Sequence, residues 1–180
     1  MSVPVRVDRQ VAVDFDALPA CADIERWLGT ALSRFPAENR HEITARFVER
    51  QESQALNAAY RGRDSATNVL SFPFEAPPGI PLLLLGDLII SPHVVAEEAK
   101  AQQKRLEDHF AHMIVHGTLH LLGMDHIEDD EAEAMEQLER EILAELGIRD
   151  PYALVSNALP SGADSVQGDV EASEEKRTDA

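Results

Sequence analysis

The sequence predicts an α+β fold in which helices pack on one small mixed β-sheet, and three observations lead to this prediction. Short apolar or alternating segments of strand length fill much of the first half of the chain. From Pro92 onward, apolar residues recur instead at the spacing of amphipathic helices. Residues that break regular structure, chiefly Pro and Gly, separate the segments. Strands that come early and helices that come late are typical of a sheet covered by helices.

Four segments have the length and the pattern of β-strands. Residues 42–49 alternate Ile43, Ala45 and Phe47 with polar neighbours, as a strand with one buried face does. A loop rich in Pro and Gly, residues 75–81, separates the last two segments. The predicted strands are VPVRVD at 3–8, extending toward Val13, EITARFVE at 42–49, VLSFPF at 69–74 and LLLLGDLIIS at 82–91.

Five segments are predicted to be helical. Pro36 is expected to stop the first helix, because proline cannot continue one. Ser91 and Pro92 are expected to cap and begin the third helix, and Gly123 and Gly147 to end the last two. The predicted helices are 21–35, 52–61, 93–102, 106–122 and 130–146. The side chains that the last helix is expected to bury are Ala134, Met135, Leu138, Ile142 and Leu146.

At 180 residues and 44% hydrophobic content, the chain is expected to form one domain with its own core, over residues 1–155. Residues 156–180 are acidic and poor in apolar side chains, so they are expected to be disordered. No segment approaches the roughly 20 apolar residues that span a bilayer, and none resembles a secretory signal. The lone Cys21 cannot form an internal disulfide, which fits a reducing cytosol. A cytoplasmic location is therefore expected.

The formal net charge of −17 argues against binding to nucleic acid or to anionic membranes by charge alone. No membrane partner is expected. A role on nucleic acid would need a local basic patch, a metal ion or a partner molecule. The basic side chains that could form such a patch are Arg46, Arg50, Arg61, Arg63, Lys100, Lys104 and Arg105.

The segment HGTLHLLGMDH, residues 116–126, has the spacing of a metal site. On a helix, His116 and His120 share one face and lie about 6 Å apart along the axis. Gly123 permits a left-handed turn that could bring His126 back as a third ligand. These offsets from His116 match the extended zinc motif of metzincin peptidases. Three imidazoles leave a position open for water or substrate, so one catalytic Zn²⁺ per chain is predicted on a zincin-like helix.

Three neighbours of these histidines bear on the chemistry. His112, one turn before His116, is expected to support the site or pack in the core rather than bind the metal. Asp125 is either a partner that orients an imidazole or a turn residue that bonds to the backbone. Peptidases with this motif carry a Glu general base directly after the first His, where this chain has Gly117. Peptide hydrolysis is therefore less favoured than a reaction for which the metal and other residues suffice.

Together with NAAYRGRDSATNVLSFPF at 57–74 and LGDLIIS at 85–91, the motif AHMIVHGTLHLLGMDH strongly resembles the YbeY family, over roughly residues 3–146. This resemblance implies a single-strand-specific, metal-dependent endoribonuclease that matures the 3′ end of small-subunit rRNA and contributes to ribosome quality control. It implies two partners, the single-stranded rRNA precursor and the ribosome or its small subunit, and it identifies no protein partner. The metal triad of the family falls on His116, His120 and His126, and its functional Arg on Arg61.

Arg61 and His116 are the residues predicted to take part in catalysis. Phosphodiester cleavage builds negative charge on the phosphoryl oxygens, and one guanidinium can bind two of them. The alternative for Arg61 is an ordinary surface ion pair with Asp64. Residues that either line the cleft or, more simply, pack at the strand edge are Thr67, Asn68 and Ser71.

Two other functions fit the same residues. A zinc peptidase-like hydrolase would use the same three histidines with another acidic residue as base, and Arg61→Ala would scarcely affect it. A non-catalytic ribosome assembly factor would use a structural zinc for stability alone, so that the metal-free protein would unfold.

Overall fold

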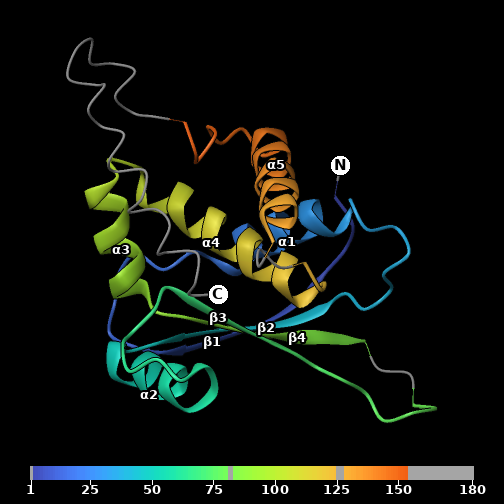
Figure 1. Ribbon diagram of the computed structural model, residues 1–180, viewed down its shortest axis with the longest axis horizontal. Coiled ribbons are helices and arrows are strands. Elements are labelled where there is room, and N and C mark those ends of the chain that lie inside the picture. Colours follow the sequence, from blue (N-terminus) through green and yellow to red (C-terminus); the bar gives the residue numbers. More distant parts are fainter. Residues whose placement is uncertain (1, 81–82, 125–127, 154–180) are drawn as a thin grey trace.

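The computed structural model describes residues 2–80, 83–124 and 128–153 (Figure 1). The predicted disordered tail at 156–180, and its boundary with the domain, lie outside these residues. Within them, no helix is long and apolar enough to cross a bilayer.

In the described chain, four strands form one mixed sheet, as the sequence predicts. The strand order is β1-β2-β4-β3. Three strands, β1 (Arg6–Ala12), β2 (Glu42–Val48) and β4 (Leu84–Ile90), run parallel, and β3 (Val69–Pro73) is antiparallel to β4. Because β3 is an edge strand, its outer backbone is accessible to side chains from other parts of the fold.

The described helices cover both faces of this sheet (Figure 1). On one face lie α1 (Cys21–Leu32), α3 (Pro92–Ala101) and α4 (Leu106–Leu121), and α5 (Asp129–Glu145) packs on the outer side of α1 and α4. The opposite face carries α2 (Arg50–Arg61). The prediction of an α+β fold is confirmed, and no helix end differs from its predicted position by more than three residues.

Side chains that alternate along the strands give the sheet a core on each face. On β2, Phe47 belongs to the main core beneath α1 and α4, where Trp27 and Phe110 are also fully buried. The next residue, Val48, points the other way into a smaller cluster under α2. That cluster consists of Val48, Leu70 and Ile89, with Leu56 and Phe72 packed against it.

The starts of β1 and of α3 differ in detail from the sequence prediction. The first strand begins at Arg6 rather than Val3, because the Val3 amide donates a hydrogen bond to the Gly29 carbonyl of α1 at 3.1 Å. Ser91 precedes α3 as expected, but its side chain makes no capping hydrogen bond. The Ser91 carbonyl accepts the amide of Val95 instead, and Pro92 needs no partner for the amide that it lacks.

The buried stripe of α5 also differs from the prediction. Ala134 is exposed, whereas Glu139 is completely buried. The prediction assumed that apolar residues alone face the core, and an ion with several hydrogen-bonding partners is the exception to that rule. The observed buried positions of α5 are Met135, Glu139, Ile142 and Leu143, with Leu138 and Leu146 partly buried.

At Gly117, α4 makes a close approach to the sheet. A Cβ atom there would lie 2.9 Å from Leu88 Cδ2 and 3.1 Å from both Ser71 Oγ and Val69 Cγ2. The Ser71 hydroxyl donates to the Gly117 carbonyl at 2.9 Å, which ties α4 to the edge strand β3. In this fold, position 117 therefore faces the sheet, and a catalytic Glu at that position would have to displace the core.

We expect Gly117→Glu to lower the free energy of unfolding by more than about 3 kcal/mol, because it inserts bulk and an unpaired charge between α4 and the sheet. Ala134→Glu is the matched control, since it adds the same charge at an exposed helical position. The control should change the free energy by less than about 0.5 kcal/mol. Urea unfolding followed by circular dichroism measures both, and equal midpoints would contradict the packing role of Gly117.

Candidate metal centre

The C-terminal half of α4 carries two neighbouring imidazoles, His116 and His120, with ring centroids 4.7 Å apart. All the remaining residues from Met113 to Leu121 are buried, whereas His116 and His120 are partly exposed. The predicted placement of both rings on one helix face is confirmed. The pair lies where the core helix meets solvent, as a site for a metal and its substrate requires.

The turn after α4 has the predicted form. Gly123 adopts a left-handed conformation with φ of 95°, and its amide donates to the His120 carbonyl at 3.0 Å. The predicted third ligand, His126, and its neighbour Asp125 lie outside the described residues. Among the described residues, no three His, Cys, Asp or Glu side chains form a complete metal site. The triad therefore remains a prediction that depends on His126.

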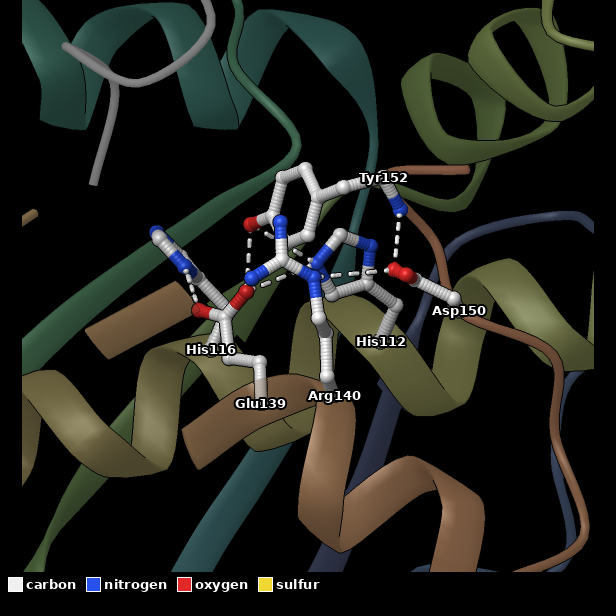
Figure 2. A network of polar contacts seen from close by, with 6 residues as sticks. All are labelled: His112, His116, Glu139, Arg140, Asp150 and Tyr152. Carbon is white, nitrogen blue, oxygen red and sulfur yellow. Dashed lines mark hydrogen bonds and ion pairs between the residues drawn. The ribbon is translucent and has the colours of Figure 1, made fainter. Parts of the chain in front are cut away.

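The carboxylate of Glu139 lies directly behind His116 (Figure 2). Its Oε2 is 2.6 Å from His116 Nδ1, and the Glu139 side chain is fully buried. Because a carboxylate only accepts hydrogen bonds, Nδ1 must carry the proton, and Nε2 is the nitrogen of His116 that can bind a metal. A carboxylate that fixes one imidazole nitrogen in this way is the usual companion of a metal-binding His. The His116–His120 pair therefore fits a divalent metal ion.

The other oxygen of Glu139 is held from the opposite side. Oε1 accepts hydrogen bonds from His112 Nε2 at 3.0 Å and from the Tyr152 hydroxyl. Tyr152 is fixed in turn, since its amide donates to Asp150 and its ring lies against the Arg140 guanidinium (Figure 2). The carboxylate thus has partners on both oxygens, and His112 is buried against it, which agrees with the expectation that His112 supports the site or packs in the core.

Burial and charge act in opposite directions in this network. Burial alone would raise the pKa of Glu139, but the His116 ring and the hydrogen bonds from His112 and His116 lower it well below its usual range. Burial lowers the pKa of His112 to about 4, against the opposing effect of Glu139. His112 Nδ1 has no hydrogen-bond partner in the described chain, so a second proton would be buried unpaired. His112 is therefore a neutral donor and Glu139 a carboxylate.

Glu139→Gln should weaken metal binding by about 10- to 100-fold, because an amide cannot accept from donors on both sides, and His116 loses the acceptor that orients it. Competition with a chromophoric chelator measures the affinity. Glu133→Gln, on an exposed position of the same helix, removes the same charge and should bind metal as the wild type does. Equal affinities of both variants would show that Glu139 does not orient a metal ligand.

The protein should lose stability as the pH falls from about 6.5 toward 4. The unfolded chain takes up a proton at His112 near its ordinary pKa of 6.5, whereas the folded chain does so only at about 4. This difference removes up to about 3 kcal/mol over that window. Below about pH 4.5, the unfolded chain also takes up a proton at Glu139, whose pKa is lowered in the folded protein, so the stability falls further.

His112→Gln tests this assignment, because glutamine keeps an N–H donor for Glu139 but does not titrate. The variant should lose distinctly less stability than the wild type between pH 6.5 and 4. Urea unfolding in the presence of a chelator measures both proteins without a contribution from metal loss. Parallel pH profiles would contradict the assignment.

Arg61 reaches the edge of the sheet instead of pairing with Asp64. Its Nη2 donates to the Ser71 carbonyl at 2.9 Å, and its Cζ lies 5.9 Å from the centre of the Phe72 ring. Asp64 accepts a hydrogen bond from Gln54 at 2.8 Å. The Ser71 hydroxyl is bonded to Gly117, the residue after His116, so Arg61 is tethered to the helix that carries the imidazoles.

Hydrogen bonds hold the loop after α2 against α2 itself. Gly62 ends the helix in a left-handed conformation with φ of 72°. The buried Ser53 hydroxyl is 3.0 Å from both the Thr67 carbonyl and the Thr67 amide, and Asn57 donates to the Ser65 carbonyl at 2.9 Å. Thr67, Asn68 and Ser71 are all buried, which agrees with their simpler interpretation as packing residues. These contacts fix the end of α2 from which Arg61 projects.

Three of the seven basic residues proposed from the sequence form local ion pairs. Arg46 pairs with Glu52 at 3.3 Å, and Arg50 with Glu97 at 2.6 Å. Arg105 lies 3.5 Å from Glu107. Arg61 and Arg63 are exposed and form no ion pair in the part of the chain that the structure describes. Two arginines without an ion pair to a described residue therefore lie at the end of α2.

Sequence reasoning missed Glu139 and Tyr152. Glu139 is one of many acidic residues in α5, and the only sequence signal is its place between Met135 and Leu143 on the apolar stripe. Tyr152 follows α5, and no local pattern connects it to α4.

These side chains define a class of site, one that offers imidazoles to a divalent metal and a guanidinium to an anionic substrate. The family model described as Endoribonuclease YbeY matches residues 8–147. Endoribonuclease YbeY of Chromohalobacter salexigens is 61% identical over 149 residues, which cover 82% of this chain and 97% of that protein. The chain belongs to the YbeY family, which consists of metal-dependent endoribonucleases.

A solved structure of lower similarity is the solution structure of TM1509 from Thermotoga maritima. It has 23% sequence identity and a TM-score of 0.46, and the match covers 77% of this chain and 91% of that chain.

Proposed function

We propose that this protein is a zinc-dependent endoribonuclease that cleaves single-stranded RNA and matures the 3′ end of small-subunit rRNA. One observation carries the proposal: Arg61 is linked through Ser71 to the same helix, α4, whose His116 is oriented by Glu139. Membership of the YbeY family supports RNA as the substrate. The proposed place of action is the cytoplasm, on the ribosome or its small subunit, where a contribution to ribosome quality control would also be made.

His116, His120 and His126 are the proposed zinc ligands. Neutral imidazole nitrogens suit zinc, and three protein ligands leave room for water or substrate. When bound, the ion supplies Lewis-acid stabilisation of the phosphoryl group and makes water a better nucleophile. Glu139 has a different task, because both of its oxygens are occupied by donors. It holds His116 in orientation and does not act as the general base.

Arg61 is the proposed partner of the scissile phosphate. Its guanidinium is exposed and forms one hydrogen bond, to the neutral Ser71 carbonyl, with no ion pair among the described residues. A phosphate oxygen is a stronger acceptor than a neutral carbonyl, so substrate can recruit Arg61 without breaking a salt bridge. The developing charge of the transition state is then neutralised in part by Arg61.

The peptidase alternative loses support from the position of Gly117. The general base of that mechanism follows the first His, and in this fold that position packs against Leu88, Ser71 and Val69.

The experiment that tests the proposal is cleavage of an end-labelled single-stranded fragment of precursor rRNA by the zinc-loaded protein. Arg61→Ala should reduce the rate by roughly 100- to 1000-fold, because it removes a preorganised donor to the phosphoryl oxygens. Arg26→Ala is the matched control, since it removes an exposed arginine of α1 whose contact is with Asp23. Metal content and unfolding midpoints are compared for all three proteins.

Loss of cleavage in Arg61→Ala alone would support the proposal, and chelation should abolish the wild-type activity. Equal cleavage by all three proteins would indicate a contaminating nuclease or another catalytic residue. A folded, zinc-loaded wild type that does not cleave would favour the non-catalytic assembly factor.

A further inference from the structure

We propose that the Tyr60 platform, defined as the rings of Tyr60 and Phe72, stacks against one unpaired base of the RNA substrate. This inference rests on the proposed function and adds to it a subsite that recognises bases. It begins from an exposed aromatic ring that the metal centre does not use.

Tyr60 is 66% exposed, a larger fraction than for the other exposed large hydrophobic residues of the described chain, Val11, Ile80 and Leu83. Its ring is nevertheless held in place. The centroids of Tyr60 and Phe72 are 5.3 Å apart with an interplanar angle of 75°, an edge-on contact. Phe72 packs in turn against the buried cluster of Val48, Leu70 and Ile89. The result is an aromatic ring that is oriented and still open to solvent.

The positively charged Arg61 contacts the second ring of the platform, Phe72. Its Cζ lies 5.9 Å from the ring centre. Arg61 and Arg63 lack ion pairs with described residues, although the chain as a whole carries a net charge of −17. An exposed ring near a guanidinium that has no ion pair with a described residue is the combination that single-stranded nucleic acids bind, with the base on the ring and the phosphate on the cation. A neutral apolar partner would not need the Arg61 guanidinium.

The platform is also connected to the metal helix. Phe72 follows Ser71 in β3, and the Ser71 hydroxyl bonds to the carbonyl of Gly117, which follows His116 in α4. The Ser71 carbonyl holds Arg61. Because Tyr60 and Arg61 both contact the Phe72 ring, a base on Tyr60 and a phosphate at Arg61 would belong to the same nucleotide or to adjacent ones.

Stacking on Tyr60 accounts for a preference for single strands. In a duplex, each base is stacked on its neighbours and paired, so its face is not available to a protein ring. An unpaired base can turn out of the strand onto the platform, and stacking tolerates any of the bases.

The test measures binding separately from cleavage. A fluorescein-labelled single-stranded RNA oligonucleotide is titrated with the full-length, zinc-loaded protein, and gels confirm that it stays intact during the anisotropy measurement. Tyr60→Ala should weaken binding by about 5- to 100-fold, and Tyr60→Phe, which keeps the ring, should stay within about twofold of the wild type. Leu83→Ala, which removes an exposed apolar side chain elsewhere, should bind as the wild type does.

A 2-aminopurine base in the oligonucleotide provides a spectroscopic signature of stacking. Its fluorescence should be quenched by the wild type and by Tyr60→Phe but not by Tyr60→Ala. The wild type, Tyr60→Phe and Tyr60→Ala should have equal affinities for duplex RNA of the same sequence. Unfolding midpoints verify that the variants are folded.

Equal affinity of Tyr60→Ala and the wild type for single-stranded RNA would overturn the platform and point to a protein partner on this ring. If the wild type still cleaves RNA in that case, the proposed function stands. Equal losses in Tyr60→Ala and Tyr60→Phe would replace stacking with a hydrogen bond from the hydroxyl, which also overturns the proposal. A wild type that neither binds nor cleaves RNA would overturn both.

Discussion

The need to neutralise one buried carboxylate organises the helical half of this protein. A fully buried Glu139 would be strongly destabilising unless its charge and its lone pairs were satisfied. Its donors come from α4, through His112 and His116, and from Tyr152 in the segment after α5. These two parts of the chain must therefore meet in one register. The same requirement that fixes α5 on α4 also fixes the ring of His116, so the folding constraint and the orientation of this imidazole are one feature.

A second constraint acts between α4 and the sheet. The absence of a side chain at Gly117 lets the helix backbone come within hydrogen-bonding distance of Ser71. Ser71 then forms two hydrogen bonds. Its hydroxyl donates to the Gly117 carbonyl in α4, and its own carbonyl accepts from Arg61. The glycine at the position of the peptidase base thus helps to link the Arg61 guanidinium to α4.

Local patterns predicted the elements of the fold, and contacts between distant segments decided what they missed. Alternation in β2 and the His spacing in α4 are properties of neighbouring residues, so both could be predicted from the sequence. The burial of Glu139 could not, because in a helix rich in Glu and Asp a single carboxylate resembles the solvated ones around it. Ala134 was wrongly placed in the core for the complementary reason, that its apolar character alone suggested burial. The link from Arg61 to Ser71 also needed the tertiary structure, because its acceptor is a backbone atom.

The position of Tyr152 makes the segment after α5 part of the support of His116 on α4. Tyr152 lies beyond residue 147, where the family match ends, and after the last helix of Figure 1. A protein shortened to end just after α5 would keep every described strand and helix, but Glu139 would lose its hydroxyl donor. Such a fragment would have a normal circular dichroism spectrum and a weakened hold on His116. Protein engineering at this terminus therefore has to preserve the chain through Tyr152, even when the purpose is only to attach a tag.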